Sequence, residues 1–262
     1  MERYRVSRED LLTLARARVL TTADLAKVLG TTRPHAARLA FDLRKRGLLT
    51  QVMRGVYASV PLDVNPKGFR ADPFLAVHKA LGDDYVFSHL SALTLLGAEQ
   101  TVHKTVHVSA PGVRSRTRDV GDFVVHVHSV PEKGWEATWT RVRRGGELLR
   151  VTSPERTLVD LASLPPRVQD YEEGLEAVRS LLRRTDTQKL LTCVQETGNM
   201  TVLARLGHLL RASGADAPQL ARVLEKIRSA VADSSPVYMA TRPKDPANRY
   251  DSEFKVVFPG GR

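Results

Sequence analysis

Residues 21–47 read TTADLAKVLGTTRPHAARLAFDLRKRG and contain two short amphipathic helical patterns separated by a turn. Thr21 begins a Thr-x-x-Asp spacing, which is typical of a capped helix start. Gly30 ends the first helix, because glycine adopts the left-handed conformation without strain. Pro34 falls in the first turn of the second helix, where its missing N–H costs little. The stretch therefore predicts a helix-turn-helix unit.

A further helix is predicted before this unit and a hairpin after it. Ser7 begins a Ser-x-x-Asp capping spacing ahead of an apolar stripe. Residues 48–53 and 56–58 read as two short strands around Arg54-Gly55, which is typical of a tight β hairpin. A hairpin directly after the second helix is a wing. Residues 1–60 are therefore predicted to form a winged helix-turn-helix domain that binds DNA.

Positive charge is concentrated in the same region. The 262-residue chain has a net charge of +11, and residues 1–60 hold twelve Lys or Arg against five Asp or Glu, a net of +7. Such a positively charged surface attracts DNA. When Lys and Arg neutralise the phosphates, the counterions condensed on the DNA are released, which favours binding. In this domain the start of the second helix enters the major groove, where arginine can donate to guanine. The predicted DNA-binding residues are Thr31, Thr32, Arg33, His35, Arg38, Arg44, Lys45 and Arg54.

Two other interpretations of this region stay open. Modules of three helices and a hairpin also serve as protein-binding domains. The cations at residues 44–46 could simply complement the negative end of their own helix. The charge excess favours DNA binding over both.

The rest of the chain predicts a larger mixed α/β domain, so the expected fold class is α+β. Residues 61–72 hold no periodic pattern and two prolines, and we expect a linker there. Residues 73–233 form the larger domain, whose C-terminal part is helical. Residues 234–262 are predicted to be a polar tail with one apolar patch.

Two alternating runs in the larger domain predict half-buried strands at 102–108 and 123–130. Histidines mark their polar faces, namely His103, His107, His126 and His128. A metal site there would need more ligands, and no cysteine or carboxylate shares the face, so we predict a solvated polar face and no metal. The basic loop between the runs is expected to give a second phosphate contact through Arg114, Arg116 and Arg118.

The sequence favours a binding protein without a cofactor over an enzyme. Ser88 is expected to cap a helix rather than to contact the adjacent His89. Asp251, Glu253 and Lys255 resemble the x-Glu-x-Lys strand of metal-dependent nucleases, yet no further carboxylate for Mg²⁺ is evident. A nuclease using Glu253 and Lys255 is kept as an alternative function.

Composition sets further limits on the class of protein. A single cysteine excludes an internal disulfide. No run of about 18 apolar residues exists, which excludes a membrane span. The polar start of the chain does not resemble a signal peptide, so a cytoplasmic protein is expected.

Three stretches together resemble the AbiEi family of antitoxins. They are RGVY at 54–57, SHLSAL at 88–93 followed by Gly97, and TSPERTLVD at 152–160. The resemblance covers about residues 5–185 and is most specific in the third stretch.

The resemblance implies a DNA-binding antitoxin that is also the transcriptional autorepressor of a toxin–antitoxin operon. The winged helix would bind inverted repeats in its own promoter. The C-terminal domain would oppose a nucleotidyltransferase-like toxin, and direct contact with that toxin is not required. A stand-alone, ligand-responsive regulator remains a further alternative, and the oligomeric state stays open.

Overall fold

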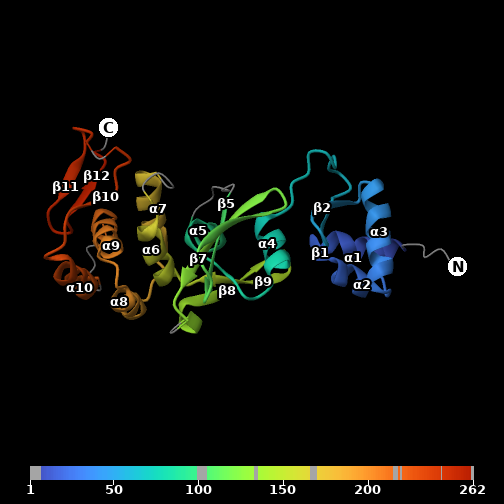
Figure 1. Ribbon diagram of the computed structural model, residues 1–262, viewed down its shortest axis with the longest axis horizontal. Coiled ribbons are helices and arrows are strands. Elements are labelled where there is room, and N and C mark those ends of the chain that lie inside the picture. Colours follow the sequence, from blue (N-terminus) through green and yellow to red (C-terminus); the bar gives the residue numbers. More distant parts are fainter. Residues whose placement is uncertain are drawn as a thin grey trace. The chain divides into compact units, whose positions relative to one another are not determined.

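In the computed structural model the chain forms two compact units (Figure 1). The described residues are 7–98, 105–132, 135–165, 170–214, 218, 220–242 and 244–260. Unit 1 consists of Met1–Val86, His103–Pro131 and Arg141–Arg150, and unit 2 consists of Phe87–Val102, Glu132–Thr140 and Val151–Arg262. Groups of helices and groups of strands both occur along the chain, which is consistent with the predicted α+β class.

Unit 1 begins with three helices and a three-stranded antiparallel sheet. The helices are α1 (Arg8–Arg16), α2 (Thr22–Val28) and α3 (Arg33–Lys45). The strands are β1 (Val19–Thr21), β2 (Leu49–Met53) and β3 (Val56–Ser59), in the order β1-β3-β2. Capping boxes at Ser7 and Thr21 start α1 and α2 as predicted. Leucines and alanines from all three helices pack into one core.

The remainder of unit 1 adds helix α4 and a larger sheet. Helix α4 is Pro73–Leu81, and the next strands are β5 (Thr105–Pro111), β6 (Arg116–Val120) and β7 (Phe123–Val130). Strand β7 pairs in parallel with β5 and antiparallel with β6. The sheet order is β6-β7-β5-β4-β9-β8, with β4 at Val86–Phe87, β8 at Trp139–Arg144 and β9 at Glu147–Thr152.

Within unit 1, α4 and the sheet pack against the N-terminal elements. Lys79 on α4 lies 2.8 Å from Glu147 on β9 and 3.5 Å from Asp24 on α2. Gly121, in the β6–β7 turn, lies directly against Val52 on β2: a Cβ added to it would stand 2.0 Å from the Val52 carbonyl oxygen. The ion pairs join α4 to α2 and β9, and the Gly121 contact holds the hairpin after α3 against the β6–β7 turn.

The Gly121→Ala variant is therefore expected to destabilise unit 1. Gly121 has a φ of +61°, and its new Cβ would meet rigid backbone. Gly146→Ala is the matched control, because Gly146 has a φ of +90° but no described atom within 4 Å of its Cβ position. Both variants lose about 1 kcal/mol to the left-handed backbone, and only Gly121→Ala adds the clash. Urea unfolding compares them, and equal losses would contradict the packing described here.

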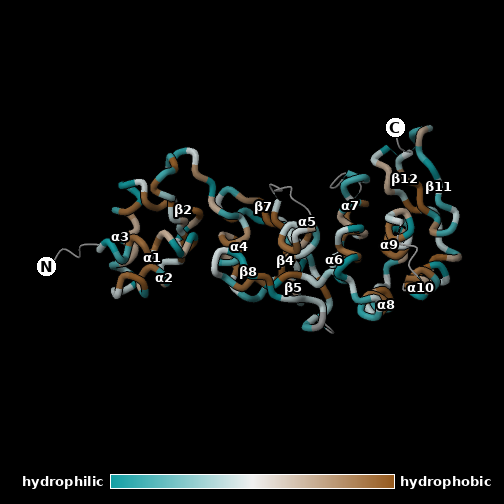
Figure 2. Tube along the Cα trace, turned by 180° about the vertical axis from the view of Figure 1, so that it is seen from behind, coloured by the Kyte–Doolittle hydropathy of each residue, from teal (hydrophilic) through white to brown (hydrophobic). Residues whose placement is uncertain are grey.

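Unit 2 is a helical body with a small sheet. Its helices are α5 (His89–Leu95), the 3₁₀ turn η1 (Trp135–Thr138), α6 (Pro154–Ser163), α7 (Tyr171–Leu182), α8 (Thr187–Glu196), α9 (Met200–Ala212) and α10 (Ala221–Val231). Both hydrophobic and hydrophilic residues lie along α9 (Figure 2), and all of residues 202–210 except Arg205 are buried. Ser153 caps α6 and Pro154 takes its first position, as predicted.

Residues 234–262, predicted as a polar tail, carry the second small sheet. Strands β10 (Val237–Tyr238), β11 (Arg249–Asp251) and β12 (Val256–Phe258) have the order β10-β12-β11. Phe254 is fully buried in the core of unit 2. A Cβ at Gly207 on α9 would stand 2.3 Å from its ring, so the glycine gives the ring its space. None of the described helices has both the length and the hydropathy of a bilayer-spanning helix.

Candidate nucleic-acid interface

Helix α3 presents a row of cations to solvent. Its apolar side, formed by Ala36, Leu39, Ala40 and Leu43, is buried. The predicted DNA-binding residues Thr32, Arg33, Arg38, Arg44, Lys45 and Arg54 are exposed, and Thr31 and His35 are half-buried. All eight belong to one unit, and their side chains are not part of its core.

The start of α3 is suited to an anion. Thr32 is its N-cap, and within the described residues its side chain makes no capping hydrogen bond. The first turn holds no acidic residue. The N–H groups of that turn carry the positive end of the helix dipole, which favours a phosphate or another anion. Arg33 extends the same positive end.

Phe41, which is not among the predicted DNA-binding residues, also lies on the exposed side of α3. Its side chain is 53% exposed, and the Lys45 ammonium lies 4.5 Å from its ring centroid. The available signal was an apolar residue three positions after Arg38, on the polar face of the predicted helix. Beside it, a hollow of about 360 Å³ is also lined by Arg44, Lys45 and Lys67.

Two of the arginines assigned to a basic loop lie on a strand. Arg116 and Arg118 belong to β6, where they pair with Val127 and Val125 of β7, so the loop prediction was wrong. Strand β6 is an edge strand, and such strands carry charged side chains that obscure the usual apolar alternation. Arg114 and Arg116 are exposed, and Arg118 is half-buried.

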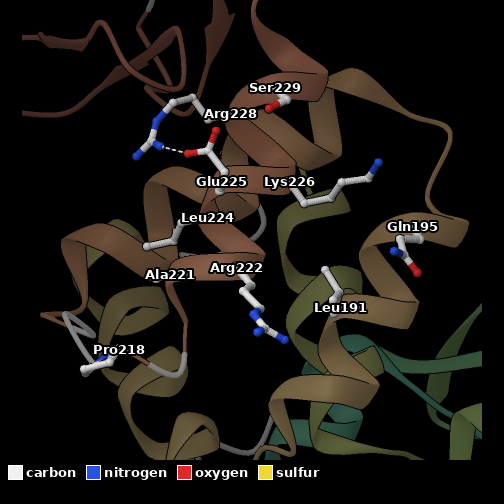
Figure 3. A pocket seen from close by; sticks show the side chains of 10 residues that line it. All are labelled: Leu191, Gln195, Pro218, Ala221, Arg222, Leu224, Glu225, Lys226, Arg228 and Ser229. Atoms are coloured by element: carbon white, nitrogen blue, oxygen red, sulfur yellow. Dashed lines mark hydrogen bonds and ion pairs between the residues drawn. The ribbon is translucent and has the colours of Figure 1, made fainter.

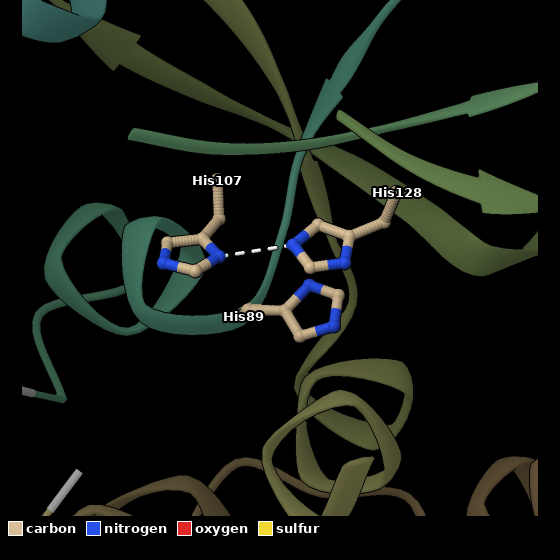
Figure 4. Close-up of side chains that lie close together, drawn as sticks. All are labelled: His89, His107 and His128. Atoms are coloured by element: carbon tan, nitrogen blue, oxygen red, sulfur yellow. Dashed lines mark hydrogen bonds between the residues drawn. The ribbon is translucent and has the colours of Figure 1, made fainter. Parts of the chain in front are cut away.

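The histidines of unit 1 form a stacked group on β5 and β7. His107 Nδ1 lies 2.9 Å from His128 Nε2, so one ring nitrogen donates to the other (Figure 4). The His107 and His126 rings stack at 5.4 Å. His107 is 4% exposed, which corrects the prediction of a solvated face. His103 lies outside the described residues.

In unit 2, Ser88 and His89 do contact each other, contrary to expectation. Ser88 is the N-cap of α5, yet its side chain makes no capping bond within the described residues. His89 has a φ of +51°, and its Nδ1 lies 2.9 Å from Ser88 Oγ, while Nε2 lies 3.2 Å from Ser163 Oγ. The left-handed backbone turns the ring toward the serine. Both residues of the pair are buried, which closes them to a substrate.

The carboxylates considered for a nuclease are bound by cationic and imidazole groups of unit 2. His208 Nδ1 donates to Asp251 Oδ2 at 2.8 Å, and the Tyr171 hydroxyl donates to His208 Nε2 at 2.7 Å. Glu253 accepts from Arg228 Nε at 2.9 Å and also pairs with Arg211. This arrangement ties the small sheet to α7, α9 and α10.

Acid is expected to weaken unit 2 through Asp251. Burial raises the pKa of this carboxyl, but bonds from His208 and the Phe254 amide, with the charge of Arg211, lower its pKa overall. The ionised carboxylate therefore stabilises the folded state at any pH above its ordinary, unfolded-state pKa of about 4. This stabilisation is lost as the pH falls through the lower folded-state pKa. Unfolding between pH 7 and pH 2 should show the advantage of wild type over Asp251→Asn shrinking below about pH 4. A constant advantage would contradict this.

Unit 2 also has a broad groove between α8 and α10, of about 860 Å³. Leu191 and Leu224 give it apolar walls, and Arg222 and Lys226 add cationic side chains (Figure 3). Glu225 is the acidic group among its lining residues and pairs with Arg228. The groove therefore combines apolar walls with a rim that is mainly cationic.

Among solved structures, the chain is similar to the crystal structure of the RV2827C protein from Mycobacterium tuberculosis. The TM-score is 0.66 at 19% identity, over 95% of this chain and 90% of that chain, which shows a shared fold. No curated protein matches the chain. The family model of the AbiEi antitoxin C-terminal domain matches residues 86–212. Residues 86–212, just under half of the chain, therefore resemble the C-terminal domain of the AbiEi antitoxin family.

Proposed function

We propose that the N-terminal part of unit 1 is a winged helix-turn-helix that binds double-stranded promoter DNA. The observation that carries the proposal is the exposed side of α3, where Arg33, Arg38 and Lys45 face solvent while the opposite side is buried. In a winged helix this second helix of the unit enters the major groove. The β2–β3 hairpin, with exposed Arg54 at its turn, is the wing and contacts the backbone.

Three further features support a DNA surface. Thr31 and Thr32 stand where the positive end of α3 can receive a phosphate. Arg44 and Lys45 line the hollow at the other end of the helix. Arg116 and Arg118 on β6, with Arg114 just before the strand, add cations in the same unit, and the three are proposed as a secondary phosphate contact.

The family match supports the second half of the proposal. A chain with an AbiEi antitoxin domain is expected to act in a toxin–antitoxin system. We propose that the protein represses its own operon through promoter inverted repeats, and that the matched domain opposes a nucleotidyltransferase-like toxin. The proposal requires no enzymatic activity. The ion pairs and hydrogen bonds that hold Asp251 and Glu253 argue against the nuclease alternative.

Two experiments with the full-length chain test these halves separately. Titration of a duplex covering the region upstream of the gene should give tighter binding than a shuffled duplex of equal length and composition. Equal binding to both would contradict promoter recognition. Co-expression with the neighbouring toxin gene should restore growth, and failure of rescue would contradict the antitoxin role. An Arg33→Ala/Arg38→Ala variant that still rescues growth would separate neutralisation from DNA binding.

A further inference from the structure

One aromatic side chain occupies the centre of the proposed DNA-reading surface. The buried side of α3 is formed by residues 36, 39, 40 and 43. With 3.6 residues per turn, the opposite side runs along Pro34, Arg38, Phe41 and Lys45, with Ala37 to one side. Ala37 and Pro34 are exposed like Phe41. Phe41 therefore lies in the middle row of this surface, between the cations Arg38 and Lys45.

This placement runs against the usual pattern of a surface helix. The polar side of an amphipathic helix normally carries charged or polar groups. Phe41 leaves 53% of its surface in water, and the Lys45 ammonium lies 4.5 Å from its ring centroid. The cation over the ring face is a favourable contact that leaves the outward edge of the ring accessible. Phe41 contributes little to the core, so its exposed ring is available for a binding contact.

The major groove offers a specific apolar group to such a side chain. Each base pair presents a distinct edge there, and the C5-methyl group of thymine is the apolar one, which phenylalanine and alanine side chains contact. Arginine and lysine instead select guanine or bind phosphate. Phe41 lies on the helix between Arg38 and Lys45, so a methyl contact would fall between two polar ones.

We propose that Phe41 is a specificity-determining residue that contacts a thymine methyl group in the major groove, with Ala37 beside it. This inference rests on the proposed DNA binding and adds the feature of the DNA that is recognised. Removal of the methyl group, by replacing thymine with deoxyuridine, deletes only this contact, because the hydrogen-bonding edge of the base is unchanged. One methyl buried against the ring contributes about fourfold in affinity.

The experiment begins by selecting preferred sites from a pool of random 30-bp duplexes with the full-length protein. Each thymine of the selected site is then replaced in turn by deoxyuridine. For wild type, one or two replacements should weaken binding about fourfold each, and the others should change little. Phe41→Ala should weaken binding to the thymine duplex about fourfold, and it should bind the thymine and the deoxyuridine duplexes with equal affinity. Phe41→Leu keeps an apolar side chain and should retain part of the methyl sensitivity.

The outcomes separate the two proposals. If the wild-type protein binds all duplexes with the same affinity, so that no sequence is selected, the proposed function is wrong. If wild type binds selectively but Phe41→Ala keeps the full sensitivity to deoxyuridine, the inference alone is overturned. The same holds if no thymine is sensitive in wild type. In that case Phe41 contacts a protein, such as a second copy of the chain, and Phe41→Ala changes the oligomeric state instead.

Discussion

The Arg33→Ala/Arg38→Ala variant is expected to bind the promoter duplex about a hundredfold more weakly than wild type. Both arginines are exposed on α3, so their loss leaves the core of unit 1 intact. A good bidentate arginine contact to guanine contributes about 1–3 kcal/mol of discrimination, and two such contacts account for the expected loss. If they bind phosphate instead, the slope of log affinity against log salt should fall by about 1.8. Titrations at several salt concentrations distinguish the two cases.

A control variant with the same loss of charge comes from the other unit. Arg222→Ala/Lys226→Ala removes two cations beside the groove between α8 and α10. It lowers the net charge equally, so it should show only the small effect of general electrostatics. If both double variants lose affinity to the same extent, binding depends on total charge, and α3 is not the reading element.

The His208→Ala variant is expected to lose about 3 kcal/mol of stability in unit 2. His208 is 3% exposed and donates to the buried Asp251 at 2.8 Å. Removal of the imidazole leaves the buried Asp251 carboxylate without its strongest partner. A buried charge that has lost its partner destabilises the folded state. The imidazole also fills core volume beside Phe258, whose ring lies 4.3 Å away between centroids. The cavity left behind adds to the loss.

A graded series tests the cause of that loss. Tyr171→Phe removes only the hydroxyl that donates to His208 Nε2, so about 1 kcal/mol is expected. Urea unfolding gives the free energies, and hydrogen exchange of residues 249–258 reports on the small sheet. Faster exchange in His208→Ala should appear first in β11 and β12. A His208→Ala variant as stable as Tyr171→Phe would show that the network does not hold the sheet.

Local signals explain how much of the N-terminal region was predictable. Capping residues and glycines act over three or four residues, so Ser7, Thr21, Gly30 and Pro34 fixed the ends of three helices from sequence alone. The alternation of Phe123–Val130 likewise predicted β7. The burial of residues 36, 39, 40 and 43 on α3 also followed from helical spacing.

Long-range contacts explain what the sequence did not show. Strand β10 pairs in parallel with β12, and Phe254 occupies space that Gly207 leaves some 47 positions earlier. Asp251 is likewise bound by His208 on α9, so its resemblance to a nuclease residue was a matter of local spacing only. The contact of Ser88 with His89 depends on the left-handed backbone conformation of His89, which no sequence motif indicated. Phe41 was overlooked, although the predicted buried side of α3 already placed it on the solvent side.

Protection of guanine N7 from dimethyl sulfate tests the central claim most directly, because N7 lies in the major groove. With the full-length protein on its promoter duplex, we expect strong protection of one or two guanines in each bound repeat. That protection should be lost in Arg33→Ala/Arg38→Ala and kept in Arg222→Ala/Lys226→Ala. A bound complex in which every guanine N7 stays as reactive as in free DNA would contradict the placement of α3 in the groove.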